Sequence, residues 1–114
     1  MAKSRVRPRE RIVPSTGNVF ADLGFPDSDQ RQTKVRLAVA VNHVVERRGL
    51  TQVKAAELLG ITQPKVSALA KYRLEGFSVE RLMRFLTLLN QDVEIVIRGN
   101  PRGRRRGRVF VTAA

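Results

Sequence analysis

The pattern over residues 52–71 constrains the fold of this chain more than any other feature of its sequence. Gly60 stands where a first helix must stop and the chain must turn, a position that favours positive φ. Ala56 falls where two steeply crossing helices come closest, and Ile61 fills the corner between them. Thr62 can cap a second helix because its side-chain oxygen suits an N-cap position. The spacing therefore predicts two helices joined by a tight turn.

The second helix of this pair is expected to end near Lys71. Pro64 lies in its first turn, where a missing backbone N–H costs nothing. Val66 and Leu69 are predicted to face the core. The side chains left pointing outward are Gln63, Lys65, Ser67 and Ala68. These offsets indicate a helix-turn-helix of the kind that enters a DNA groove, although the same spacing also fits an αα-hairpin with a purely structural role.

Length and composition limit the class of protein. A chain of 114 residues without internal repeats is expected to form one small domain. It has no cysteine, which excludes disulfides and thiolate metal sites. No apolar run approaches the ~18 residues of a membrane span, and no apolar stretch follows the arginine-rich N-terminus as it would in a secretory signal. We therefore predict a cytoplasmic protein without a membrane partner.

The formal net charge of +12 is concentrated at the two ends of the chain. Residues 1–18 carry five basic residues against Glu10, and residues 98–114 carry six arginines and no acid, which leaves +2 for the middle. Basic arms of this kind typically follow phosphate backbones and bind more tightly at low salt. A purely solubilising role is the alternative, and the arginine-glycine tail also fits RNA binding.

The remaining pattern predicts the domain boundaries. Residues 1–18 lack periodicity and are interpreted as a disordered basic arm, residues 19–97 as the folded domain, and residues 98–114 as a basic arginine-rich tail.

Within the domain, residues 19–25 are expected to form a short irregular segment or a turn of helix. Asp27 and Gln30 fit a capping box that begins a helix running to about Arg48. Its predicted buried side consists of Val35, Leu37, Ala38, Val41, Val44 and Val45.

Two further caps are predicted. Thr51 is expected to cap the helix that Gln52 opens, and Ser78 to cap a last helix, with Phe77 stapled against a residue one turn in. The buried residues of that last helix are predicted to be Leu82, Phe85, Leu86 and Leu89.

Residues 92–97 are rich in β-branched side chains and partly alternate, so they are predicted to form a strand. A lone strand is not stable in water, and it needs a partner. That partner is either the segment 109–112 of the same chain or the same strand of a second subunit. The arginines near Val109 favour the second subunit.

The sequence offers no active site. His43, the only histidine, lies in the middle of a predicted helix without a partner, so a structural role is favoured over a ligand or base. Ser67 has no triad partners, and Asp92 and Glu94 lack a third ligand, so a solvated strand face explains that pair. No glycine-rich loop has the context of a phosphate cradle. We therefore expect neither an enzyme nor a cofactor or metal.

DNA binding assigns each outward residue a role. Gln63 can present a bidentate amide to adenine, and Lys65 can reach guanine or a phosphate. Ser67 suits base or backbone, Ala68 suits a thymine methyl, and Gln52 at a helix N-terminus suits a phosphate. Lys71, Tyr72 and Arg73 follow the recognition helix and are expected to contact the backbone. The residues predicted to bind DNA are Gln52, Lys54, Thr62, Gln63, Lys65, Ser67, Ala68, Lys71 and Arg73.

The motif resembles the Cro/CI-type helix-turn-helix, also called the XRE (xenobiotic-response-element) family. The residues that carry the resemblance are Gln52, Ala56, Gly60, Ile61 and Val66. The wider chain, in the segments 17–24, 76–82 and 92–95, is similar to the HigA-like antitoxin branch of that family. The resemblance covers about residues 17–98.

The resemblance implies an all-α, five-helix, lambda-repressor-like domain that binds DNA as a dimer and represses its own operon. The C-terminal β-strand and the basic flexible tails would be added to this domain. In such proteins two glutamines open the two helices of the motif, which implies phosphate contact for Gln52 and base contact for Gln63. Lys54 stands where relatives often carry a glutamate that completes a capping box with Thr51, so we interpret it as a phosphate contact.

The antitoxin branch further implies a small toxin protein as partner. Toxins of this module are typically basic ribonucleases, to which a chain of net charge +12 is electrostatically mismatched. Only Asp22, Asp27 and Asp29 form an acidic cluster that could face such a protein.

Together these features predict a sequence-specific DNA-binding transcriptional regulator, an autorepressor that works as a homodimer on double-stranded DNA. The alternative is a protein-interaction or RNA-binding module in which the tails supply charge and the helix pair is a scaffold.

Overall fold

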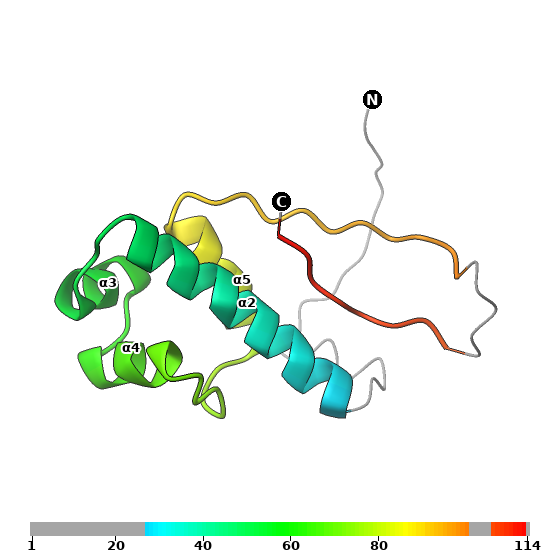
Figure 1. Cartoon of the computed structure of the whole chain (residues 1–114), viewed down its shortest axis with the longest axis horizontal. Coiled ribbons are helices and arrows are strands. Elements are labelled where there is room, and N and C mark those ends of the chain that lie inside the picture. Colours follow the sequence, from blue (N-terminus) through cyan, green and yellow to red (C-terminus); the bar gives the residue numbers. More distant parts are fainter. Residues whose placement is uncertain (1–26, 101–105, 114) are drawn as a thin grey trace.

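The computed structural model describes residues 27–100 and 106–113, and the regular elements of this part are four helices (Figure 1). They are α2 (Asp27–Arg47), α3 (Gln52–Leu59), α4 (Gln63–Ala70) and α5 (Val79–Leu88). Their bounds agree with the predicted helices to within a residue or two. The predicted arm over residues 1–18 and the short segment over 19–25 lie outside the described residues, so the described part holds four of the five implied helices.

The core forms where α2 packs against α5, α4 and the connecting segments. Residues Leu37, Ala38, Val41 and Val44 make one apolar stripe along α2, and all four are buried as predicted. Val45 is partly buried and packs against the same core. The prediction for Val35 was wrong, because its side chain is 39% exposed. Val35 lies two positions before Leu37, which turns it to the opposite side of a helix of 3.6 residues per turn.

The last helix buries the side chains that the sequence predicted. Leu82, Phe85 and Leu86 of α5 and the following Leu89 all lie in the core. Phe77, just before the helix, is buried too, and its ring meets that of Phe85 edge-on with centroids 5.9 Å apart. This contact fixes the entry of α5 against its own second turn.

Three N-terminal caps differ in how fully they form. Thr51 Oγ1 accepts from the backbone N–H of Lys54 (3.1 Å), and Ser78 Oγ accepts from that of Arg81 (3.1 Å), so both predicted caps are confirmed. Thr62 has the extended backbone of an N-cap, but its hydroxyl caps no backbone N–H. The prediction for Thr62 therefore holds for the backbone and fails for the side chain.

The predicted strand over residues 92–97 is not formed in the described chain. Residues 92–100 instead run as an extended segment away from α5 (Figure 1), and no described backbone group pairs with them in a ladder. Because a β-strand exists only through its neighbour, the β-branched sequence alone does not produce one. Among the described residues this leaves an all-α fold.

The C-terminal tail also differs from the expected free tail at one point. Val111 packs against the core, and its carbonyl accepts a hydrogen bond from Arg36 Nη1 of α2 (3.3 Å). Val93 packs against the same core. The segment 106–113 is thus attached to the domain through Val111.

The turn between α3 and α4 yields a test of backbone strain. Gly60 has φ +70°, and a Cβ added there would meet no atom within 4 Å, so only the backbone conformation opposes a side chain. We predict that Gly60→Ala lowers the free energy of unfolding by about 1–2 kcal/mol, measured by urea denaturation. The control is Gly76→Ala, which also meets no atom but lacks a positive φ, and which should change stability by no more than about 0.5 kcal/mol. Equal effects of the two substitutions would contradict this explanation.

Candidate nucleic-acid interface

The α3–α4 pair has the compact turn that its sequence predicted. The backbone N–H groups of Gly60 and Ile61 both donate to the Ala56 carbonyl, at 2.9 and 3.1 Å, which ends α3 and redirects the chain. Ile61 is partly buried and packs against the core, as expected for a corner residue. Ala55 is fully buried and Ala56 is half-buried, so the alanine most excluded from solvent lies one residue before the predicted contact.

Two different interactions hold α4 against the rest of the domain. Val66 and Leu69 are buried, which orients the helix about its axis. Asn42 of α2 donates from Nδ2 to the Leu69 carbonyl at 3.1 Å. The same carbonyl also accepts from the Tyr72 N–H (3.1 Å), so the Asn42 bond is a second bond to it and ties the end of α4 to α2. The N-terminus of α4 points away from this attachment.

The first turn of α4 presents its side chains to solvent. Gln63 is the first residue of the helix and Lys65 the third, and both are exposed. Ser67 and Ala68 are only half-buried rather than fully outward, and Ala68 packs partly against the core. The solvent-facing surface of α4 is therefore concentrated near its N-terminus. The side chains that are freest to reach another molecule are those of Gln63 and Lys65.

The N-terminus of α3 adds a second polar group. Gln52 is the first residue of α3 and is exposed, and the first N–H groups of a helix have no partner within it. The Lys54 ammonium lies 3.7 Å from a Glu57 carboxylate oxygen. Both side chains are largely exposed, and such surface pairs contribute little to stability. Lys54 is thus free to exchange this carboxylate for another anion.

The segment after α4 is basic and exposed. Lys71 occupies the C-cap position, Arg73 lies two residues later, and both are exposed. Between them, Tyr72 has a left-handed backbone with φ +60°. Sequence patterns predicted the charge of this segment but contain no signal for the unusual backbone at a tyrosine.

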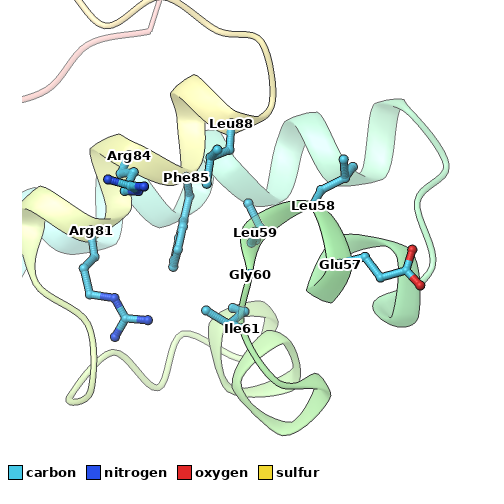
Figure 2. Close-up of a pocket in the computed structure, with 9 residues that line it drawn as sticks. All are labelled: Glu57, Leu58, Leu59, Gly60, Ile61, Arg81, Arg84, Phe85 and Leu88. Carbon is cyan, nitrogen blue, oxygen red and sulfur yellow. The ribbon is translucent and has the colours of Figure 1, made fainter.

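A shallow open groove of about 370 Å³ lies between the end of α3 and α5 (Figure 2). Its apolar floor and sides come from Leu58, Leu59, Ile61, Phe85 and Leu88. Arg81 and Arg84 extend from α5, and the Glu57 side chain points away from them. The described residues that line the groove include neither a nucleophile nor a histidine. Within the described residues, no group of three or more His, Cys, Asp or Glu side chains could bind a metal, and His43 is exposed.

Comparisons with known proteins agree with this geometry. A family model described as a helix-turn-helix domain matches residues 19–98. The chain is also similar to a solved structure named for the XRE family of transcriptional regulators, with 62% sequence identity and a TM-score of 0.73. That similarity covers 78% of this chain and all of the other. No curated protein sequence matches the chain. None of the described helices is long and apolar enough to cross a membrane.

Proposed function

This chain belongs to the helix-turn-helix domain family, a non-enzymatic family, and we propose that it is a sequence-specific DNA-binding transcriptional regulator that represses its own promoter. One observation carries the proposal. The helix α4 is buried along Val66 and Leu69, while its first turn offers exposed Gln63 and Lys65. A helix whose back is packed and whose N-terminal side chains are free suits insertion into the major groove.

The proposed contacts divide between bases and backbone. Gln63 reads an adenine edge with its amide, and Lys65 reaches guanine acceptors, because both offer donors near the start of the inserted helix. Gln52 and Lys54, near the start of α3, contact phosphates, supported by the positive end of the helix dipole. Thr62 lies beside Gln63 with a hydroxyl that caps no N–H, so it is assigned a polar DNA contact.

The remaining predicted residues have supporting roles. Half-buried Ser67 and Ala68 lie deeper along α4, where Ser67 bonds base or backbone and Ala68 contacts a thymine methyl through its exposed part. Lys71 and Arg73 contact phosphates at the far end of α4. Phosphate contacts fix the position of the protein on the duplex, and the base contacts select the sequence.

We also propose that the protein acts as a homodimer. One domain of this size reads few base pairs, and a two-fold dimer doubles its contacts over half-sites about 10 base pairs apart. The extended segment after α5 supports this proposal, because Ile95 and Ile97 are 72% and 91% exposed and its backbone has no ladder partner in the described chain. The same segment of a second subunit would supply the missing hydrogen bonds and cover the apolar side chains.

A toxin partner is not part of the proposal. The HigA-like resemblance implies one, but a net charge of +12 opposes association with a basic ribonuclease. The basic tails instead support attachment to nucleic acid. A cytoplasmic location is part of the proposed function. An RNA-binding or protein-interaction module remains the competing function, and it differs from the proposal in lacking preference for a DNA sequence.

The first prediction concerns base reading. Replacing Gln63 or Lys65 with Ala should reduce discrimination between an operator duplex and a scrambled one by about 1–3 kcal/mol, because each substitution removes donors to base edges. The operator is obtained by selection from a random duplex library, and affinities are measured by fluorescence anisotropy. Lys34→Ala on α2 is a control for loss of one positive charge. If both test variants weaken the two duplexes equally, these residues contact only phosphate.

The second prediction concerns the basic tail. Replacing Arg102, Arg104, Arg105 and Arg106 with Gln should weaken binding to all duplexes alike and flatten the dependence of log affinity on log salt. Each lost phosphate contact reduces that slope by roughly 0.9. Substitution is preferred to deletion because deletion would also remove Val111 from the core. An unchanged slope would assign the tail a solubilising role.

The third prediction concerns assembly. Ile95→Pro removes a backbone donor from the proposed intersubunit ladder, and it should convert the protein to a monomer in sedimentation and abolish tight operator binding. The exposed position of Ile95 leaves the helices intact, which circular dichroism checks. Ile95→Thr keeps both the N–H and the β-branched side chain and should remain dimeric. A Pro variant that stays dimeric with unchanged operator affinity would locate the interface elsewhere.

A further inference from the structure

All four described helices end in the same way. After each one, a residue adopts the left-handed conformation, and the next residue donates its N–H to a carbonyl five positions back. The left-handed residues are Gly49, Gly60, Tyr72 and Asn90. Glycine and asparagine are the residues that tolerate this conformation best, because glycine lacks a Cβ and asparagine can bond locally. Three of the four ends therefore follow the rule, and the end of α4 does not.

The turn at Tyr72 is fully formed despite its tyrosine. The Tyr72 N–H donates to the Leu69 carbonyl at 3.1 Å, and the Arg73 N–H donates to the Ala68 carbonyl at 2.9 Å. These are the two bonds of a Schellman motif, in which the left-handed position strongly prefers glycine. A bulky side chain at φ +60° is a steric outlier. The sequence thus retains a disfavoured residue where the other three helix ends carry a favoured one.

In the described chain, no hydrogen bond or aromatic contact of the tyrosine side chain offsets this strain. Tyr72 is 44% exposed, and within the described residues its hydroxyl has no hydrogen-bond partner and its ring makes no aromatic or cation–π contact. Strained residues persist where function requires them, and they cluster at binding sites. A free phenol beside the end of the helix proposed to enter DNA is suited to an external partner.

We propose that the Tyr72 hydroxyl donates a hydrogen bond to a DNA phosphate oxygen at the edge of the groove that α4 enters, and that this contact is retained at the expense of fold stability. This inference rests on the proposed function. Lys71 and Arg73 flank the tyrosine and are both exposed, so the phosphate would lie in a positive surrounding. A phenol is a neutral donor, so it can orient a phosphate without increasing the dependence of DNA affinity on salt concentration.

The proposal predicts opposite changes in stability and binding for one substitution. Tyr72→Gly should raise the melting temperature by about 4–8 °C, because it relieves the left-handed strain, and should weaken binding to both selected and scrambled duplexes about tenfold. Tyr72→Phe keeps the ring and the strain, so it should leave the melting temperature unchanged and weaken both duplexes to a similar extent. The control is Asn90→Gly at the end of α5, which should alter neither quantity appreciably.

The outcomes separate three explanations. A lower melting temperature for Tyr72→Gly would show that the ring packs to stabilise the fold, and the proposal would be overturned. A higher melting temperature with unchanged DNA affinity would equally overturn it. A failure of the proposed function gives a different result: the wild-type protein would bind the selected and scrambled duplexes with equal affinity. In that case, weaker binding of Tyr72→Phe to both duplexes would still show that Tyr72 contacts the DNA backbone.

Discussion

The apolar stripe of α2 is the constraint on which the rest of the structure depends. Leu37, Val41 and Val44 give α5 and α4 a common surface to pack against, and burial of such side chains contributes about 1.5–3 kcal/mol each. Asn42, on the same helix, bonds the Leu69 carbonyl at the end of α4. The C-terminal end of α4 is thus attached to α2, and α3 packs against α4. A helix held in this way can present Gln63 and Lys65 in a fixed orientation without support from its exposed face.

The turns at the helix ends determine which side chains the fold presents to solvent. The left-handed residue Gly60 sets the angle between α3 and α4 and leaves the start of α4 exposed. The corresponding turn at the end of α4 carries a strained tyrosine between two cations, whereas the turns that end α2 and α5 carry glycine and asparagine. The turns at Gly49, Gly60 and Asn90 use residues that fit the left-handed conformation, and the turn that ends the helix proposed to enter DNA uses one that does not. The backbone strain at Tyr72 is therefore explained by the proposed contact with DNA.

Local rules predicted much of this structure from the sequence. The caps at Thr51 and Ser78, the turn at Gly60 and the buried face of α5 depend on neighbours a few residues away, and the structure confirms them. The strand over residues 92–97 is not formed within the described chain, because pairing is not a local property: β-branched residues favour a strand only when a neighbouring backbone is present. Anchoring of Val111 on α2 was missed for the same reason, since contacts between distant residues leave no periodic signal. The roles of Gln63 and Lys65 follow from helix position and remain proposals.

Direct comparison of selected and random DNA tests the central claim. The full-length protein is titrated at physiological salt with a fluorescent duplex enriched from a random library, in competition with a scrambled duplex of equal length and composition. The account predicts saturable binding with a preference for the selected duplex of at least about 10³-fold, typical of specific DNA recognition. Equal affinity for the two duplexes, with the same salt dependence, would contradict it and would mean that the basic tails alone attach the protein to nucleic acid.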